Sequence, residues 1–305
     1  MKLSQFYQKL PAAVRLIEVG PRDGWQNLTE FIPTATKIEL IDELGCCGFN
    51  EIEVSSFVNP KAIPQLRDAA AVFAAIKSVP SMVTAALVPN RRGLEPALKA
   101  GVGKIVFFIS ASDTHNRKNL GCPQSETLSE IKIMLEQLPA VAQFRVSISN
   151  VFGCPYEDQI LFSSVKQLVK NLFEIGFREI TLCDTLGVAT PDQVYEFSTR
   201  LKGDFPEVDF GLHLHDSCGR ALAGVIAGLQ AGIDRFDTAA GGLGGCPYAP
   251  GAAGNLATED LLFTLDKMGV KTGIDSQALL AYVRRQVLIA GNGSSHMLSF
   301  SESCN

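Results

Sequence analysis

Residues 179–216 read EITLCDTLGVATPDQVYEFSTRLKGDFPEVDFGLHLHD and contain two short strand-like runs joined by one helix-like segment. The strand-like runs are EITLCDT from 179 and DFGLHLHD from 209. Between them, Thr190-Pro191-Asp192 offers a helix N-cap with proline at the first helical position. Val194, Phe197 and Leu201 then fall on one helical face. The stretch therefore predicts a strand, a helix and a second strand.

The same alternation recurs along the whole chain. Further strand-like runs, separated by segments with helical spacing of apolar residues, are RLIEVG from 15, EIEVSSF from 51, MVTAALV from 82, KIVFFIS from 104, FRVSIS from 144 and RFDTAAGG from 235. Eight such units over roughly 250 residues match a closed TIM (β/α)8 barrel, whereas an open doubly wound sheet usually has fewer strands. An open dinucleotide-binding sheet is also disfavoured because Gly20-Pro21-Arg22-Asp23-Gly24, not GxGxxG, follows the first run.

We therefore predict an α/β protein with two parts. A catalytic TIM barrel is expected over residues 1–270. A short helical appendage and a polar tail are expected over residues 271–305, with Gly291-Asn292-Gly293 ending the last ordered helix.

The composition excludes two classes of partner. The chain has 305 residues, of which 46% are hydrophobic and 19% charged, and its formal net charge is -5. It has no lysine or arginine run that would attract nucleic acid or an anionic membrane. No apolar run reaches the roughly 18 residues of a membrane-spanning helix. We expect no nucleic-acid partner and no membrane partner.

The cysteines and the first residues bear on the compartment. Eight cysteines occur without a CxxC pair or a regular spacing, which argues against a zinc ribbon or a disulfide framework and favours a reducing compartment. The opening MKLSQFYQKLPAAV lacks the apolar core and the small-residue cleavage site of a secretory signal. We expect a cytoplasmic protein.

Polar side chains gather at the ends of the predicted strands, where the catalytic groups of TIM barrels lie. They are Arg22 and Asp23 after the first strand, Glu53 and Ser56 at the end of the second, Asp184 and Thr185 at the end of the sixth, and His213, His215 and Asp216 at the end of the seventh. All of them should converge on one mouth of the barrel.

His213 and His215 form the most specific pattern in this set. Alternate residues of a strand point to the same side, so both imidazoles would face the barrel interior. With Asp23 as a carboxylate ligand and Asn255 as a neutral oxygen donor, they would suit Mg²⁺ or Mn²⁺. The alternative is a pair of hydrogen-bonded rim histidines, with Asp23 as a turn residue. Two of only four histidines on one inward face favour the metal.

The segment GGLGGCPYAPGAAGN, residues 241–255, is rich in glycine around Cys246. Neither helix nor strand propensity explains such a composition. A lid that closes over the barrel mouth would carry Cys246 to the reaction and exclude water. An ordinary surface loop with a small buried hydrophobe explains the composition equally well.

Five segments of the sequence together resemble the hydroxymethylglutaryl-CoA lyase family, and the similarity covers nearly the whole chain. RDG and HxHD are shared by a wider superfamily of metal-dependent barrel lyases and synthases, whereas the glycine-cysteine loop is specific to the lyases. The segments are EVGPRDGWQN from 18, EVSSFVNP from 53, CDTLGVATP from 183, HLHD from 213 and GGLGGCPYAPGAAGNLATED from 241.

The resemblance implies a role for each residue of the site. Metal binding is implied for Asp23, His213, His215 and Asn255, and catalysis for Arg22, Asp23, Glu53, His213 and Cys246. Arg22 would stabilise an enolate beside the thioester carbonyl, and Cys246 would transfer a proton. Substrate contacts are expected from Arg22, Ser56, Asp184 and Thr185, although Asp184 also suits a turn cap.

The implied reaction is cleavage of (3S)-3-hydroxy-3-methylglutaryl-CoA, an acyl-CoA, to acetyl-CoA and acetoacetate with a divalent cation. The family also implies a place in leucine degradation and a homodimer. Trp25, Leu28, His115 and Asn150 depart from the family pattern near expected substrate contacts. A related branched 3-hydroxyacyl-CoA is therefore an alternative substrate. A Claisen-type synthase or an aldolase, and a barrel that has lost catalysis, are further alternatives.

Overall fold

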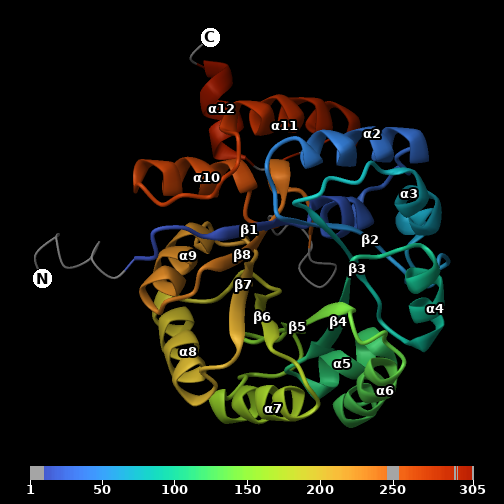
Figure 1. Cartoon of the computed structure of the whole chain (residues 1–305). Coiled ribbons are helices and arrows are strands. Elements are labelled where there is room, and N and C mark those ends of the chain that lie inside the picture. The colour runs from blue at the N-terminus through green and yellow to red at the C-terminus, as the bar shows by residue number, and fades with distance from the viewer. Residues whose placement is uncertain (1–9, 246–253, 292, 294, 304–305) are drawn as a thin grey trace, which may run out of the picture.

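The computed structural model describes residues 10–245, 254–291, 293 and 295–303. Its centre is a closed barrel of eight parallel strands in sequence order (Figure 1). The strands are β1 (Arg15–Glu18), β2 (Glu51–Ser56), β3 (Val83–Leu87), β4 (Lys104–Ser110), β5 (Gln143–Ser149), β6 (Glu179–Asp184), β7 (Asp209–Leu214) and β8 (Arg235–Thr238). Each predicted run contains one of these strands, and the predicted TIM barrel is confirmed.

The barrel closes between its first and last strands. β1 pairs in parallel with β8, with Arg15 opposite Arg235 and Glu18 opposite Thr238. Apart from their first residues, most strand positions are buried, as expected of parallel strands with helices on the outside and packed side chains within. All carboxyl ends of the strands therefore lie at one mouth of the barrel.

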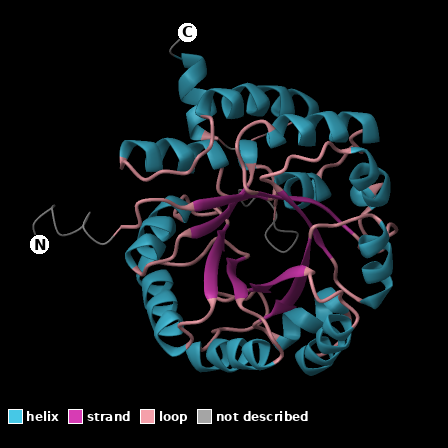
Figure 2. Ribbon diagram, in the orientation of Figure 1, coloured by secondary structure: helices cyan, strands magenta, loops and turns pink. Residues whose placement is uncertain are grey.

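A ring of helices surrounds the strands (Figure 2). α8 begins as predicted, because the Thr190 N–H donates to the Gln193 side chain at 3.1 Å and Pro191 takes the first helical position. Val194, Phe197 and Leu201 are buried under it. The helices of the ring are α2 (Thr34–Gly45), α3 (Ala69–Ala75), α4 (Arg91–Lys99), α5 (Asp113–Leu120), α6 (Gln124–Glu136), α7 (Phe162–Glu174), α8 (Pro191–Asp204) and α9 (Ala221–Gln230).

Short helical turns occur in the loops that follow or connect these elements. They are η1 (Gly20–Gly24), η2 (Trp25–Asn27), η3 (Pro64–Leu66) and η4 (Ala240–Gly242). η1 directly follows β1, and η4 directly follows β8, so the two turns lie next to each other at the closure of the barrel. This position brings both turns to the mouth.

The C-terminal helices are α10 (Thr258–Lys267), α11 (Ser276–Ala290) and α12 (His296–Ser303), drawn in red in Figure 1. Arg285 of α11 pairs with Glu39 and Glu43 of α2. Gly291 follows α11 with a φ of 73°, in agreement with the predicted helix end. The predicted polar tail is wrong for residues 296–303, which form α12. The reason is tertiary: the Asp260 carboxylate accepts hydrogen bonds from the first backbone N–H groups of α12.

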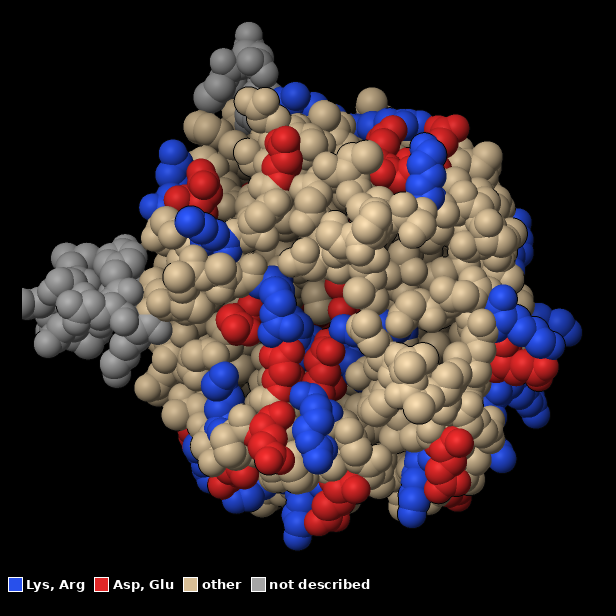
Figure 3. Space-filling model, viewed as in Figure 1, with Lys and Arg blue, Asp and Glu red and all other residues tan. Residues whose placement is uncertain are grey.

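On the face shown in Figure 3, basic and acidic residues are interspersed and form mixed clusters. Within the part of the chain that the structure describes, no helix has the length and apolar character required to cross a membrane.

Candidate active site

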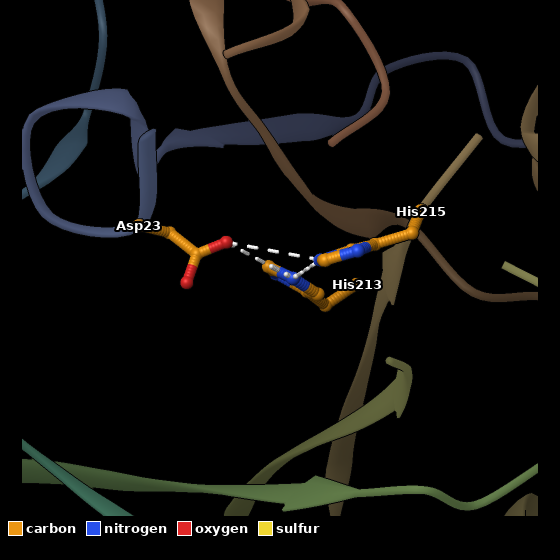
Figure 4. Close-up of side chains that lie close together, drawn as sticks. All are labelled: Asp23, His213 and His215. Carbon is orange, nitrogen blue, oxygen red and sulfur yellow. Dashed lines mark hydrogen bonds and ion pairs between the residues drawn. The ribbon is translucent and has the colours of Figure 1, made fainter. Parts of the chain in front are cut away.

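Three buried side chains meet at the carboxyl ends of β1 and β7. Asp23 comes from η1, His213 from β7, and His215 from the residue just beyond that strand. The Nε2 atoms of the two histidines lie 3.2 Å apart, and each lies 3.8 Å from Asp23 Oδ2. Figure 4 shows the three side chains pointing toward one another. They form a cluster of the kind that can hold a metal ion.

The backbone of η1 explains the position of Asp23. The segment GPRDG forms a single π-helical turn directly after β1, and such turns occur frequently at functional sites. The Asp23 N–H donates to Val19 O at 2.7 Å. This turn places the consecutive residues Arg22 and Asp23 together at the barrel mouth.

The side-chain amide of Asn255 lies against the Asp23 carboxylate of the cluster. Its Nδ2 donates to Asp23 Oδ2 at 2.7 Å and to Leu243 O at 3.0 Å. Its Oδ1 is buried and has no hydrogen-bond partner among the described residues. A buried amide oxygen without a donor is costly unless a cation or water fills the place of the donor. Two imidazole nitrogens, a carboxylate and this oxygen therefore fit a divalent cation.

The electrostatics keep the Asp23 ligand charged. Burial acts to raise the pKa of Asp23, but the Arg22 guanidinium and the two histidines outweigh burial and hold this pKa well below its usual range. Metal ligands must be deprotonated in order to bind. The carboxylate is thus in the state that a cation requires.

Arg22 is fixed by ion pairs on two sides. Its Nε pairs with Glu53 Oε1, and its Nη1 pairs with Asp23 Oδ1. The other Glu53 oxygen accepts a hydrogen bond from Arg145 Nη2 at 2.6 Å. Glu53 and Arg145 are both fully buried, where charged groups persist only when they are paired. Glu53 therefore orients the guanidinium of Arg22 beside the metal cluster.

Arg145 and Asp237 were not predicted from the sequence. Asp237 Oδ2 lies 3.4 Å from His213 Nδ1 and 3.5 Å from Arg145 Nη1. A carboxylate behind a histidine ligand fixes the ring so that its other nitrogen faces the metal. Burial acts to raise the pKa of Asp237, but Arg145 and His213 lower this pKa to about 2. The sequence feature that could have indicated them is a charged residue within each strand, Arg145 in FRVSIS and Asp237 in RFDT.

Comparisons with known proteins show the family of this chain. The HMGL-like family model matches residues 13–285. Hydroxymethylglutaryl-CoA lyase YngG of Bacillus subtilis is 46% identical over 272 residues, which are 89% of this chain and 91% of that protein. The chain belongs to the HMGL-like family. The family predicted from the sequence is thereby confirmed.

Two further relatives are named for the substrates or ligands that they bind. The 3-hydroxy-3-isohexenylglutaryl-CoA/hydroxy-methylglutaryl-CoA lyase of Pseudomonas aeruginosa is 40% identical over 291 residues, 93% of this chain and 96% of that protein. The structure of an HMG-CoA lyase from Acinetobacter baumannii in complex with coenzyme A and 3-methylmalate has a TM-score of 0.91 and 38% identity, and covers 95% of each chain. Both similarities extend over nearly the whole HMGL-like chain.

The two described ends of the glycine-rich segment of this HMGL-like protein lie close together, beside the cluster. Cys246 lies outside the described residues. The flanking residues are described: a Cβ on Gly254 would lie 2.5 Å from Gly242 O and 2.7 Å from Gly244 O. Only glycine permits so close an approach of two backbones. The two ends of the segment are therefore packed together next to Asn255.

The predicted substrate contacts are at the mouth but bond to the backbone. Ser56 Oγ donates to Leu87 O at 3.1 Å, and Thr185 Oγ1 accepts from the Asn150 N–H at 3.0 Å. Both Asp184 oxygens accept backbone N–H groups, those of Val188 and Ala189. These bonds match the turn-cap alternative for Asp184.

Two of the departures from the family pattern have structural explanations. Trp25 is 1% exposed and belongs to the hydrophobic core, so its indole packs beneath η2. Asn150 has a φ of 57°, a left-handed conformation that asparagine tolerates better than most residues. Trp25 is therefore a packing residue of the core.

Proposed function

We propose that this HMGL-like protein cleaves 3-hydroxy-3-methylglutaryl-CoA to acetyl-CoA and acetoacetate with Mg²⁺ or Mn²⁺ bound at Asp23, His213, His215 and Asn255. The observation that carries the proposal is the convergence of these ligands beside Arg22 in a chain 46% identical to a hydroxymethylglutaryl-CoA lyase. A related HMG-CoA lyase binds coenzyme A, which supports an acyl-CoA substrate.

The reaction breaks the C2–C3 bond of the substrate. The tertiary hydroxyl releases its proton to solvent and becomes the ketone of acetoacetate, while the electron pair of the broken bond leaves with the thioester as its enolate. The proton that Cys246 later gives to the enolate is replaced from solvent, so the reaction consumes no net proton. Asp23, His213, His215 and Asn255 would hold a divalent cation, whose positive charge would lower the cost of deprotonating the hydroxyl. Asp23 and His213 are catalytic in the sense that they hold this arrangement in place.

Arg22 and Cys246 act on the departing fragment. The guanidinium of Arg22, held by Glu53, stabilises the negative charge of the enolate, a contribution commonly worth about 3 kcal/mol in a site that excludes water. Cys246 then donates a proton to the enolate carbon and completes acetyl-CoA. Closure of the 241–255 segment would bring its thiol to that carbon.

The other predictions complete the proposal. Substrate contacts come from Ser56, Asp184 and Thr185. Each side chain would use a hydrogen-bonding position that its bond to the backbone does not occupy. Residues 1–270 form the catalytic barrel, and residues 271–305 form the C-terminal helical appendage, in which α12 takes the place of most of the predicted tail. The protein works as a homodimer in the cytoplasm, in leucine degradation.

A second candidate substrate is a related branched 3-hydroxyacyl-CoA. The relative in Pseudomonas aeruginosa is named for an isohexenylglutaryl thioester as well as for the methyl one. The two substrates differ only in the alkyl group on C3, which takes no part in the bond cleavage. A synthase or aldolase of the same superfamily is less favoured, because these relatives are named as lyases.

The direct test is acetyl-CoA release from both thioesters by the purified protein with Mg²⁺ or Mn²⁺. We expect cleavage of the methyl substrate and loss of cleavage with a chelator. Slow cleavage of the methyl substrate with fast cleavage of the isohexenyl substrate would retain the chemistry and overturn the substrate. No cleavage of either would overturn the proposal.

The role of Cys246 has its own test. Cys246→Ser should lower kcat by at least about a hundredfold, the usual effect of removing a positioned acid, with Mn²⁺ content unchanged. Cys46→Ser is the control, since Cys46 is an exposed thiol after α2. Equal kcat values for the wild type and Cys246→Ser would remove the thiol from the mechanism.

A further inference from the structure

The short turn η4 is held by side chains from three other elements. The Ala240 N–H donates to Glu18 Oε1 of β1 at 3.0 Å, and the Gly241 N–H donates to both oxygens of Glu259 in α10 at 3.1 Å. On the opposite side of the peptide group, Gln286 Nε2 of α11 donates to Ala240 O at 2.7 Å. The turn is thus bonded at consecutive backbone groups.

These three anchors are buried as deeply as the catalytic residues. Glu18 and Gln286 are 0% exposed, and Glu259 is 2% exposed. Buried polar side chains are stable only with their hydrogen bonds made. The Tyr282 hydroxyl, one turn earlier on α11, bonds to Gln286 Oε1. This contact fixes the amide orientation and directs the Gln286 NH₂ group at Ala240 O.

A short chain of contacts connects η4 with the metal cluster. Leu243, the residue after η4, accepts a hydrogen bond through its carbonyl from Asn255 Nδ2 at 3.0 Å. The same nitrogen donates to Asp23 Oδ2. Gly254 is in close contact with Gly242 and Gly244, so a shift of η4 must also move the residue before Asn255. The position of η4 therefore sets the position of the Asn255 amide.

We propose that Gln286 is a positioning residue for the reaction, through which the C-terminal helix α11 holds η4, Asn255 and the start of the glycine-rich segment in their working geometry. This inference rests on the proposed function and assigns a catalytic purpose to the appendage. Gln286 contacts no ligand of the metal cluster among its described bonds and acts through Ala240.

The test compares two adjacent residues of α11. Gln286→Leu keeps the approximate size of the side chain but removes the donor to Ala240 O. Arg285→Met is the matched control, because Arg285 attaches α11 to α2 through Glu39 and Glu43 and has no described bond to η4. Each variant is measured for thermal stability, Mn²⁺ affinity, hydrogen exchange of residues 239–245, and kcat and KM.

For Gln286→Leu we expect faster exchange at residues 240–243, weaker Mn²⁺ binding and a kcat about tenfold lower with little change in KM, since small displacements of catalytic groups reduce rates steeply. Arg285→Met should lower thermal stability but leave Mn²⁺ affinity, kcat and this exchange at wild-type values. Tyr282→Phe, a milder change, should shift exchange and kcat in the direction of Gln286→Leu.

Two results would overturn the inference. One is wild-type exchange, Mn²⁺ affinity and kcat in Gln286→Leu, or in Tyr282→Phe if Gln286→Leu does not fold. The other is equal losses in Gln286→Leu and Arg285→Met, which would reduce Gln286 to a stabilising residue. Failure of the proposed function is distinguishable, because it would appear as an inactive wild type, whereas exchange and Mn²⁺ binding require no substrate.

Discussion

The ring orientation of His213 depends on Asp237, a residue outside the proposed set of metal ligands. The Nε2 of this ring faces Asp23 and His215, while the Nδ1 faces Asp237. A carboxylate in that position selects the tautomer and the ring orientation needed for binding through Nε2. Asp237 is in turn held by Arg145, which also bonds to Glu53 behind Arg22. One buried guanidinium thus supports both His213, a proposed metal ligand, and Arg22, the proposed catalytic arginine.

Asp237→Asn tests this support at the scale of one residue. The neutral amide attracts the His213 N–H less strongly, so we expect Mn²⁺ affinity to fall about tenfold, with the secondary structure retained. The control is Glu51→Gln, which removes a different carboxylate partner of Arg145, at 3.0 Å from Nε. That variant should lose stability and keep its Mn²⁺ affinity. Equal affinities of Asp237→Asn and the wild type, by calorimetry, would contradict the role of Asp237.

The sequence predicts only part of this site, for a physical reason. Asp23, His213 and His215 are predictable because strand alternation and the rule for barrel mouths depend on local sequence. Arg145 and Asp237 meet across the barrel interior, and their pairing depends on how β5 faces β8. Nothing near either residue in the sequence records that contact.

At the scale of elements, helix ends were predicted where one local rule decides them. Gly48 lies shortly after the end of α2, and its φ of 95° is the left-handed conformation that glycine adopts after a helix. The start of α12 could not be predicted, because its cap is Asp260 of another helix. Tertiary capping is not visible in the residues next to a helix.

Gly48→Ala tests the end of α2. Alanine at this φ is strained by about 1 kcal/mol, and its Cβ would lie 2.6 Å from Gly273 O, too close for a backbone oxygen to tolerate. Gly101→Ala is matched in backbone, with a φ of 76°, but has open space around the added carbon. We expect Gly48→Ala to lower the free energy of unfolding by at least about 1 kcal/mol more than Gly101→Ala in urea titrations. Equal losses would mean that the contact with Gly273 relaxes freely.

At the scale of the whole molecule, Glu18 links β1, η4 and α10 into one buried unit. Its Oε1 accepts the N–H groups of Gly20 and Ala240, and its Oε2 accepts the Thr258 hydroxyl at 2.7 Å. Burial raises the pKa of Glu18 from 4.5 to about 7, against the lowering effect of these hydrogen bonds. Because Glu18 is buried where the barrel closes and its pKa is raised, the stability of the protein depends on pH.

The neighbours of Glu18 determine whether the pH dependence of stability can be assigned to Glu18 alone. Burial also raises the pKa of Glu259, so this second carboxyl acts in the same direction. Burial raises the pKa of Cys47 to about 12 and that of Tyr282 well above its usual range, so both stay neutral below pH 8. Glu18, with its pKa of about 7, is thus the group of this cluster that changes charge near neutral pH.

The sign of the effect follows from proton binding. A folded-state pKa above the unfolded value means that the folded protein binds more protons between pH 4.5 and about 7. The stability associated with protonated Glu18 is therefore fully present below pH 4.5 and is lost as pH rises through about 7. The loss for this one group is at most about 3 kcal/mol.

Glu18→Gln should flatten this fall in stability. Glutamine is neutral at every pH, its Oε1 can accept the same two N–H groups, and its Nε2 can donate to Thr258. Urea unfolding at several pH values from 5 to 8 should show a steady loss of stability in the wild type and a smaller loss in the variant. Glu196→Gln, at an exposed site on α8, should keep the wild-type slope. If Glu18→Gln also keeps that slope, Glu18 is already ionised at pH 5 and its hydrogen bonds outweigh its burial.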